Sequence, residues 1–142
     1  MRKSILETIT NPTMLKKMTL KELEILASEI RHFLINAISK TGGHIGANLG
    51  VIELTIALHS VFDAITEPLV FDVGHQGYTH KLLTGRKDLF KSLNKFGGMS
   101  RFLSRSESMY DVLDASHGGT SISTATGMAL SLIHISEPTR RS

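Results

Sequence analysis

The feature of this sequence that most constrains its fold is a series of apolar residues that recur at helical spacing between residues 20 and 38. Residues spaced in this way lie along one face of an α-helix, so the series predicts a long amphipathic helix. Thr19 and Glu22 match the S/T-x-x-E capping box, in which side chains satisfy amide groups at the start of a helix. The sequence Thr-Gly-Gly at residues 41–43 predicts its end. With 142 residues, the chain is long enough for one domain with one hydrophobic core.

The composition excludes several classes of protein. Apolar residues make up 41% of the chain and charged residues 20%, which is typical of a soluble globular protein rather than a disordered one. The net charge is only +3 and the basic residues are spread along the chain, so we predict no nucleic-acid partner. The lack of cysteines excludes disulfides, thiolate metal sites and a cysteine nucleophile, and it fits a cytoplasmic protein. We find neither a signal peptide nor a membrane-spanning segment and predict no membrane partner.

The remaining pattern predicts an α/β fold with a parallel sheet and flanking helices. Residues 69–73 form a short apolar run bounded by turn residues, which is typical of a buried parallel strand. Helices are predicted over residues 49–62, over residues 78–84 and from about residue 120, with a long loop over residues 92–109. In the helix over residues 49–62, Asn48 would be the N-cap. The residues expected to face the core there are Val51, Leu54, Leu58, Val61 and Phe62.

Three segments differ in their patterns. Residues 1–18 are a lead-in, and residues 19–130 carry the predicted helices, strand and glycine-rich turns. Residues 131–142 have a different period and contain the helix-breaking Pro138. This tail is similar to the translation of a common sequencing adapter. We therefore interpret it as an artefact and exclude it from the predicted fold.

Four histidines lie beside glycines or in loops: His44, His75, His80 and His117. Glycine lets the backbone approach a ligand closely, and imidazole can donate a hydrogen bond or move a proton near neutral pH. His75 is the best placed, because it follows the predicted strand and open α/β sheets bind ligands at the carboxyl ends of their strands. The alternative is that Gly74 and His75 only form a turn after the strand.

The turns around His44 and His117 each leave two interpretations open. Both turns are rich in glycine and precede a predicted helix, so each could hold an anion at a helix amino terminus or be a plain turn. His80, beside Lys81 on a short helix, is expected to be a surface residue. No two histidines show the i, i+4 spacing with an acid that marks an H-E-x-x-H site, so we predict no metal ligand among them.

Several short motifs occur in a fixed order along the chain. They are Gly-Gly-His at 42–44, Asn-Leu-Gly at 48–50, Asp-Val-Gly-His-Gln at 72–76, His-Lys-Leu-Leu-Thr-Gly-Arg at 80–86, Phe-Gly-Gly at 96–98, Arg-Ser-Glu-Ser at 105–108, Tyr-Asp-Val-Leu at 110–113 and Thr-Ser-Ile-Ser at 120–123. Each motif alone is weak. Their joint order and spacing, from about residue 14 to residue 130, resemble those of the 1-deoxy-D-xylulose-5-phosphate synthases.

The resemblance implies a homodimeric transferase of the transketolase type with a parallel α/β fold that binds thiamine diphosphate and Mg²⁺. The implied reaction joins pyruvate to D-glyceraldehyde 3-phosphate with loss of CO₂. It gives 1-deoxy-D-xylulose 5-phosphate for isoprenoid, thiamine and pyridoxal synthesis. By position, His75 would lie against the cofactor, and Ser116, His117 and Gly118 would form a loop that touches it. His44 would be a catalytic residue that assists proton transfer.

Two departures from the family pattern keep alternatives open. The family usually has Gly-His-Ser-Ser-Thr-Ser where this chain has Ser-His-Gly-Gly-Thr-Ser at residues 116–121. The chain also ends before the Gly-Asp-Gly stretch that begins the family's metal site, so we expect the Mg²⁺ ligands beyond its end and expect the fragment alone to be inactive. The alternatives are another transketolase-like thiamine-diphosphate enzyme and a non-catalytic homologue that acts as a binding partner.

Overall fold

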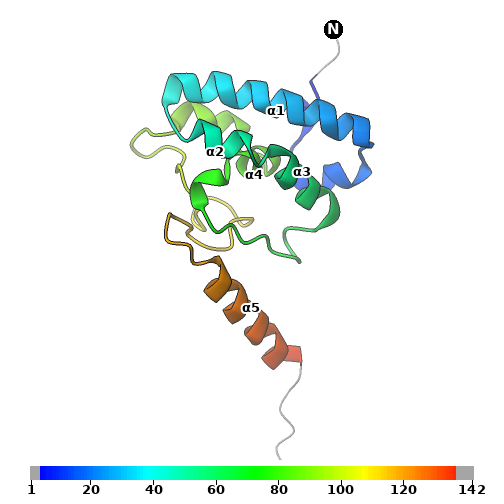
Figure 1. The fold of residues 1–142 in the computed structure, drawn as a ribbon, viewed down its shortest axis with the longest axis vertical. Helices are drawn as coiled ribbons and strands as arrows, with labels where there is room; N and C mark the ends of the chain where they lie inside the picture. Colours follow the sequence, from blue (N-terminus) through cyan, green and yellow to red (C-terminus); the bar gives the residue numbers. More distant parts are fainter. Residues whose placement is uncertain (1–3, 137–142) are drawn as a thin grey trace, which may run out of the picture.

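The computed structural model describes residues 4–136, which form a helical body from which one helix projects (Figure 1). In chain order, its α-helices and 3₁₀ helices (η) are η1 (Leu6–Thr8), η2 (Pro12–Lys17), α1 (Leu20–Thr41), α2 (Ile45–Leu49), α3 (Ile52–Val61), η3 (Gly74–Gln76), α4 (Tyr78–Leu83), η4 (Lys87–Ser92) and α5 (Ser121–Ser136).

The long amphipathic helix predicted from residue 20 is confirmed as α1. Its capping box is formed in both directions. Glu22 N donates to Thr19 Oγ1 at 3.3 Å, and Thr19 N donates to a Glu22 carboxylate oxygen at 2.8 Å. The helix ends at Gly42, whose φ of +75° lies in the region that favours glycine. One face of α1 is buried along its length, through Leu26, Ala27, Ile30, Leu34 and Ile38.

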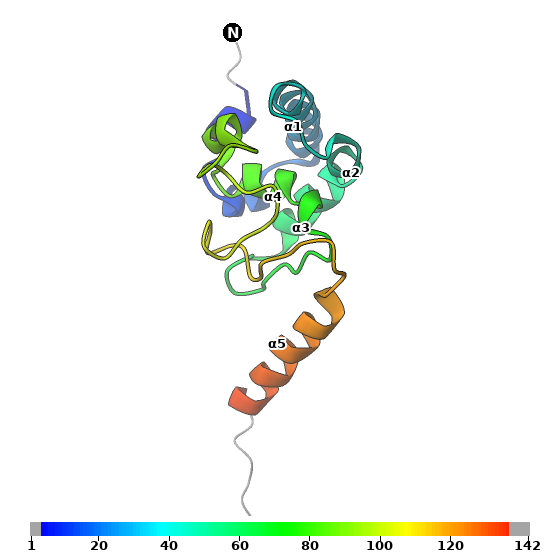
Figure 2. The same cartoon turned by 90° about the vertical axis from the view of Figure 1, so that its left-hand side faces the viewer.

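The hydrophobic core lies between α1 and the shorter helices. Figure 2 views α1 nearly end-on, with the shorter helices beneath it. Buried side chains from the amino-terminal segment, α3, α4 and η4 complete the core: Leu6, Leu15, Ile52, Ile56, Tyr78, Leu82, Leu83 and Phe90. The segment before α1 is also held by polar contacts. The carboxylate of Glu29 accepts hydrogen bonds from Ser4 Oγ and from the backbone amides of Ile5 and Leu6.

The predicted α/β fold with a parallel sheet is wrong for residues 4–136, none of which belongs to a strand. Residues 69–73 were expected to be a buried strand, but they form an irregular and mostly half-buried segment. A strand exists only where a second strand satisfies its backbone groups. Here the neighbouring backbone contributes one such hydrogen bond beside this segment, from Gly74 N to Ser116 O at 3.0 Å. The long loop predicted over residues 92–109 is confirmed, since the chain from residue 93 to residue 120 contains no helix.

Helix α3 turns a different face to the core from the one predicted. The expected core residues Leu54, Val61 and Phe62 are 60%, 66% and 40% exposed. The buried face instead carries Ile52, Thr55, Ile56 and His59. Because α3 is apolar on nearly all sides, its sequence alone does not distinguish the two faces. Asn48 is likewise not the N-cap of α3, because it lies buried in α2.

Helix α5 projects from the body in both views (Figures 1 and 2). Several of its apolar side chains are exposed to solvent, including Ile122 (81% exposed) and Leu132 (61% exposed). The helix continues across residue 130, where the tail was expected to begin, so helical structure does not mark that boundary. Residues 137–142 of the tail lie outside the described residues, and its interpretation as an artefact stays a prediction. Within residues 4–136, no helix is both long and apolar enough to cross a membrane.

Candidate functional site

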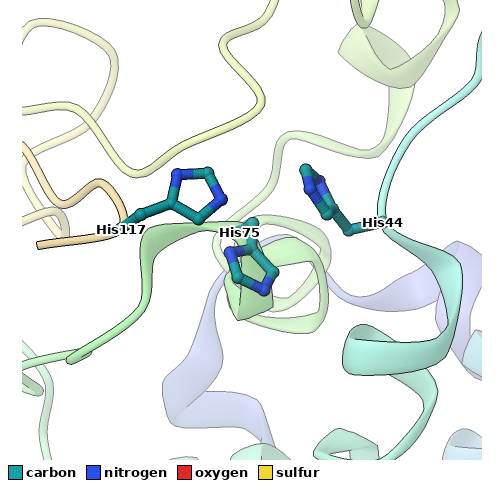
Figure 3. A group of neighbouring side chains, drawn as sticks. All are labelled: His44, His75 and His117. Carbon is teal, nitrogen blue, oxygen red and sulfur yellow. The ribbon is translucent and has the colours of Figure 1, made fainter. Parts of the chain in front are cut away.

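Three of the histidines singled out in the sequence meet at one place, although they are far apart in the chain (Figure 3). The rings of His44 and His75 are stacked, with centroids 4.4 Å apart. The ring of His117 lies 4.9 Å from that of His75 and 5.8 Å from that of His44. Phe102 meets His117 edge-on at 5.1 Å. His44, His75 and His117 are called the histidine cluster below.

Three different turns supply the histidine cluster. His44 precedes α2, His75 lies in η3, and His117 lies in the loop before α5. Gly74 allows the second and third turns to meet, because a Cβ atom at this position would lie 2.1 Å from the carbonyl oxygen of Ala115. A side chain there would therefore push His75 and His117 apart.

Asn48 joins the first two turns and is fully buried. Its side-chain amide nitrogen donates to the carbonyl oxygens of His44 and His75, each at 2.6 Å. Its side-chain oxygen accepts from the backbone amide of Tyr78 at 2.9 Å. One side chain thus fixes the backbone of two histidines in the cluster. Sequence reasoning missed this role because the Asn48 side chain bonds residues 27 and 30 positions away.

The ring nitrogens of the histidine cluster keep hydrogen-bonding capacity unused. Among the described residues, Nδ1 of His44 and Nδ1 of His75 are buried and have no hydrogen-bond partner. Burial lowers the pKa of His75, and the neighbouring His44 and His117 lower it further. His75 is therefore neutral at pH 7, and its ring offers one nitrogen as an acceptor.

Ser116 and Gly118, the other two residues predicted to contact a cofactor, flank His117 in an exposed loop. Gly118 borders open space, since a Cβ atom there would meet only the methyl group of Thr120, at 3.7 Å. The amino terminus of α5 was considered above as an anion site, but a carboxylate of the chain itself binds there. The carboxylate of Asp72 accepts a hydrogen bond from Ser121 N at 3.1 Å, and bonding to Ser121 lowers the pKa of Asp72.

His80, expected at the surface, is completely buried at the centre of a polar network. Its Nε2 donates to Asp111 at 3.2 Å, and its Nδ1 accepts from Nε2 of His59 at 2.9 Å. Arg86 binds the same carboxylate with both Nη atoms at 2.8 Å. Burial opposes ionisation of Asp111, but the hydrogen bonds from His80 and Arg86 outweigh it, so the pKa of Asp111 is lowered.

A second carboxylate extends this network. Nζ of Lys81 is buried and donates to Glu107 at 2.5 Å and to the carbonyl oxygen of Ser100 at 2.9 Å. Glu107 also accepts from Arg86 at 3.2 Å. Glu107 and Asp111 both belong to the loop over residues 93–120, so the cations of α4 and the following turn hold this loop against the body. The loop then continues to His117.

Six side chains from these contacts are called the buried ionic network below: His59, His80, Lys81, Arg86, Glu107 and Asp111.

Comparison with known proteins decides the family. A family model described as 1-deoxy-D-xylulose-5-phosphate synthase matches residues 6–140, which is nearly the whole chain. The chain belongs to the 1-deoxy-D-xylulose-5-phosphate synthase family. The chain is 54% identical over 127 residues to 1-deoxy-D-xylulose-5-phosphate synthase 1 of Geobacter sulfurreducens. It is 56% identical over 122 residues to the 1-deoxy-D-xylulose-5-phosphate synthase of a Geobacillus species. These alignments cover 89% and 86% of this chain.

The chain spans about a fifth of the length of these relatives, 20% of the Geobacter protein and 19% of the Geobacillus protein. A third synthase, from Dechloromonas aromatica, is 53% identical over 133 residues, which are 94% of this chain and 22% of that protein. The resemblance derived from the sequence motifs is therefore confirmed: the chain corresponds to one part of a 1-deoxy-D-xylulose-5-phosphate synthase.

Proposed function

We propose that this chain is part of a transferase that condenses pyruvate with D-glyceraldehyde 3-phosphate, releasing CO₂ and forming 1-deoxy-D-xylulose 5-phosphate. The observation that carries the proposal is the histidine cluster. The positions expected to serve catalysis and cofactor binding, His44, His75 and His117, come together in a chain that belongs to this family. A product of this kind supplies isoprenoid, thiamine and pyridoxal synthesis.

The residues of the cluster fit a polar organic cofactor, for which we propose thiamine diphosphate. The Nδ1 atoms of His44 and His75 are buried and have no hydrogen-bond partner among the described residues. The loop at Ser116 and Gly118 leaves space for a ligand to approach the backbone. We propose that His75, Ser116, His117 and Gly118 hold the cofactor and orient it. Thiamine diphosphate supplies a nucleophilic carbon that a protein side chain cannot provide. His44, stacked on His75, would pass a proton to or from the substrate oxygen.

The described residues do not fit Mg²⁺, the second cofactor implied by the family. Mg²⁺ prefers oxygen ligands in octahedral geometry, whereas the cluster offers only imidazole nitrogens. Two acids close in sequence to His75 and His117 are already bonded: Asp72 accepts from Ser121 N, and Asp114 accepts from Ser104 Oγ and Arg105 N. We therefore expect the Mg²⁺ ligands outside residues 4–136 and assign no step to this ion here.

We further propose that the whole enzyme is a homodimer in the cytoplasm. The lack of cysteines supports a cytoplasmic location. Exposed apolar side chains on α3 and α5, such as Leu54 and Ile122, support burial of these helices by a further protein surface.

One observation favours a second candidate, a non-catalytic homologue that only binds a partner. Residues 118–119 are glycines where the family usually has two hydroxyl side chains, so this loop offers fewer hydrogen bonds to a cofactor.

Calorimetric titration of thiamine diphosphate into the full-length protein, with Mg²⁺ present, separates the two candidates. We expect saturable binding that His75→Gln weakens about tenfold, or ~1.4 kcal/mol. The control His32→Gln changes an exposed histidine on α1 and should bind as the unchanged protein does. If millimolar thiamine diphosphate does not bind, the proposed synthase activity is contradicted and the non-catalytic homologue is favoured.

A further inference from the structure

We propose that the histidine cluster is also a binding site for a divalent transition-metal ion, with Zn²⁺ as the ion that suits it best. One nitrogen from each of His44, His75 and His117 can be chosen so that all three lie within 4.8 Å of one another. This inference goes beyond the proposed synthase activity and does not depend on it. It concerns what the three imidazoles bind in the absence of the organic cofactor.

The geometry is within reach of metal coordination. Imidazole nitrogens bind Zn²⁺ at about 2.0–2.1 Å, so two ligands of a tetrahedral ion lie about 3.4 Å apart. The nitrogens of the cluster must therefore approach by no more than about 1.4 Å. Metal binding would require this approach through rotation about side-chain torsions. His117 is exposed, which leaves a path for an ion to enter.

The nitrogen atoms themselves point to a missing partner. Buried polar atoms nearly always have a hydrogen-bond partner, and those without one call for an explanation. In the part of the chain that the structure describes, Nδ1 of His44 and Nδ1 of His75 are both buried and unpartnered. Two such atoms on stacked rings, beside a third imidazole, are accounted for if a ligand accepts their lone pairs.

The donor set selects the class of ion. Three imidazole ligands suit Zn²⁺, Co²⁺, Ni²⁺ and Cu²⁺, whereas Mg²⁺ and Ca²⁺ require oxygen ligands. Three histidines also leave a fourth position for water, which is the pattern of accessible zinc sites rather than closed structural ones.

The surroundings hold two of the ligands in place. Asn48 bonds the carbonyl oxygens of both His44 and His75, so their backbones cannot separate without breaking two partly buried hydrogen bonds. Sequence spacing did not predict this site, because its ligands come from three separate turns rather than from one helix.

Equilibrium dialysis of the full-length protein against Zn²⁺, without thiamine diphosphate, tests the proposal. We expect one equivalent of Zn²⁺ that depends on the cluster, with affinity lost at least tenfold in His75→Gln and in His117→Gln. His117 is exposed, so its substitution should leave the fold intact, which circular dichroism checks. The control His32→Gln, which removes one exposed histidine, should retain full binding.

Co²⁺ provides a second measurement. Its visible absorption is intense in four-coordinate sites and weak in six-coordinate ones, so the cluster should give an intense band that His117→Gln abolishes. Equal Zn²⁺ binding by His117→Gln, His32→Gln and the unchanged protein would overturn the proposal. A protein that binds thiamine diphosphate but shows no cluster-dependent Zn²⁺ would overturn this inference alone and leave the proposed function standing.

Discussion

At the scale of single residues, Asn48 holds together the turns of two histidines of the cluster. Its side chain satisfies three backbone groups, in the turns of His44 and His75 and at the start of α4. Two of these bonds are partly buried and the bond to Tyr78 is buried, so loss of a partner there costs more than loss of a hydrogen bond at the surface.

Substitution of Asn48 by alanine is expected to lower the free energy of unfolding by about 3 kcal/mol, because it removes three hydrogen bonds between a buried side chain and the backbone. Chemical denaturation of the full-length protein measures this change. The matched control Asn36→Ala removes an exposed asparagine from α1 and should change stability by less than about 0.5 kcal/mol. Equal effects of the two substitutions would contradict the role assigned to Asn48.

The sequence singled out the three histidines that the structure brings together, but not the contacts that hold them. His44, His75 and His117 stood out because each lies in a glycine-rich turn within a recognisable motif. The carbonyl groups that Asn48 bonds, and the close packing of Gly74 on Ala115, leave no local pattern in the sequence. They join segments distant in the chain, so only the folded structure reveals them.

At the scale of elements, the buried ionic network attaches an irregular loop to α4. The chain from residue 93 to residue 120 has no helix to fix it, yet Glu107 and Asp111 anchor it to Lys81, Arg86 and His80. The position of His117 follows from this attachment.

Substitution of Arg86 by alanine is expected to destabilise the protein by about 3–5 kcal/mol, because it leaves the buried Asp111 carboxylate without its main counter-charge. The control Arg31→Ala breaks the exposed pair with Glu53, whose side chains are 38% and 61% exposed, and should cost less than about 1 kcal/mol. Thermal unfolding of both variants gives the comparison. A loss from Arg86→Ala no larger than that from Arg31→Ala would show that the network does not support the loop.

The network also predicts how stability depends on pH. Burial, and then the nearby His80, lowers the pKa of His59 from 6.5 to about 3. In the unfolded chain, His59 therefore binds a proton below about pH 6.5. In the folded protein, it binds one only below about pH 3. The stability contributed by neutral His59 is thus fully present above pH 6.5 and is lost as the pH falls.

Denaturation measured at several pH values tests this dependence. Between pH 6.5 and pH 4, His59 is expected to contribute a loss of about 1 kcal/mol per pH unit. His59→Gln removes the titrating group but keeps a polar side chain near His80, so its stability should fall less steeply. Identical pH slopes for the variant and the unchanged protein would contradict the assignment.

At the scale of the whole molecule, sequence reasoning predicted α1 and its caps, but it failed for the fold class. A capping box and a one-sided apolar face are local signals, and they predicted α1 correctly. The run at residues 69–73 has the composition of a strand, but a strand depends on a pairing partner that residues 4–136 do not supply. Apolar residues lie on nearly all sides of α3, so its sequence does not show which side is buried. Packing against the neighbouring elements determines the buried face.

We propose that His44, His75 and His117 form one binding site of a thiamine-diphosphate synthase. A crystal structure of the full-length protein with thiamine diphosphate would show whether they do. The predicted result is a cofactor in contact with His75 and His117, with the ring of His44 beside it. A cofactor bound away from these three residues, or a structure in which they lie apart, would show that they do not form its binding site.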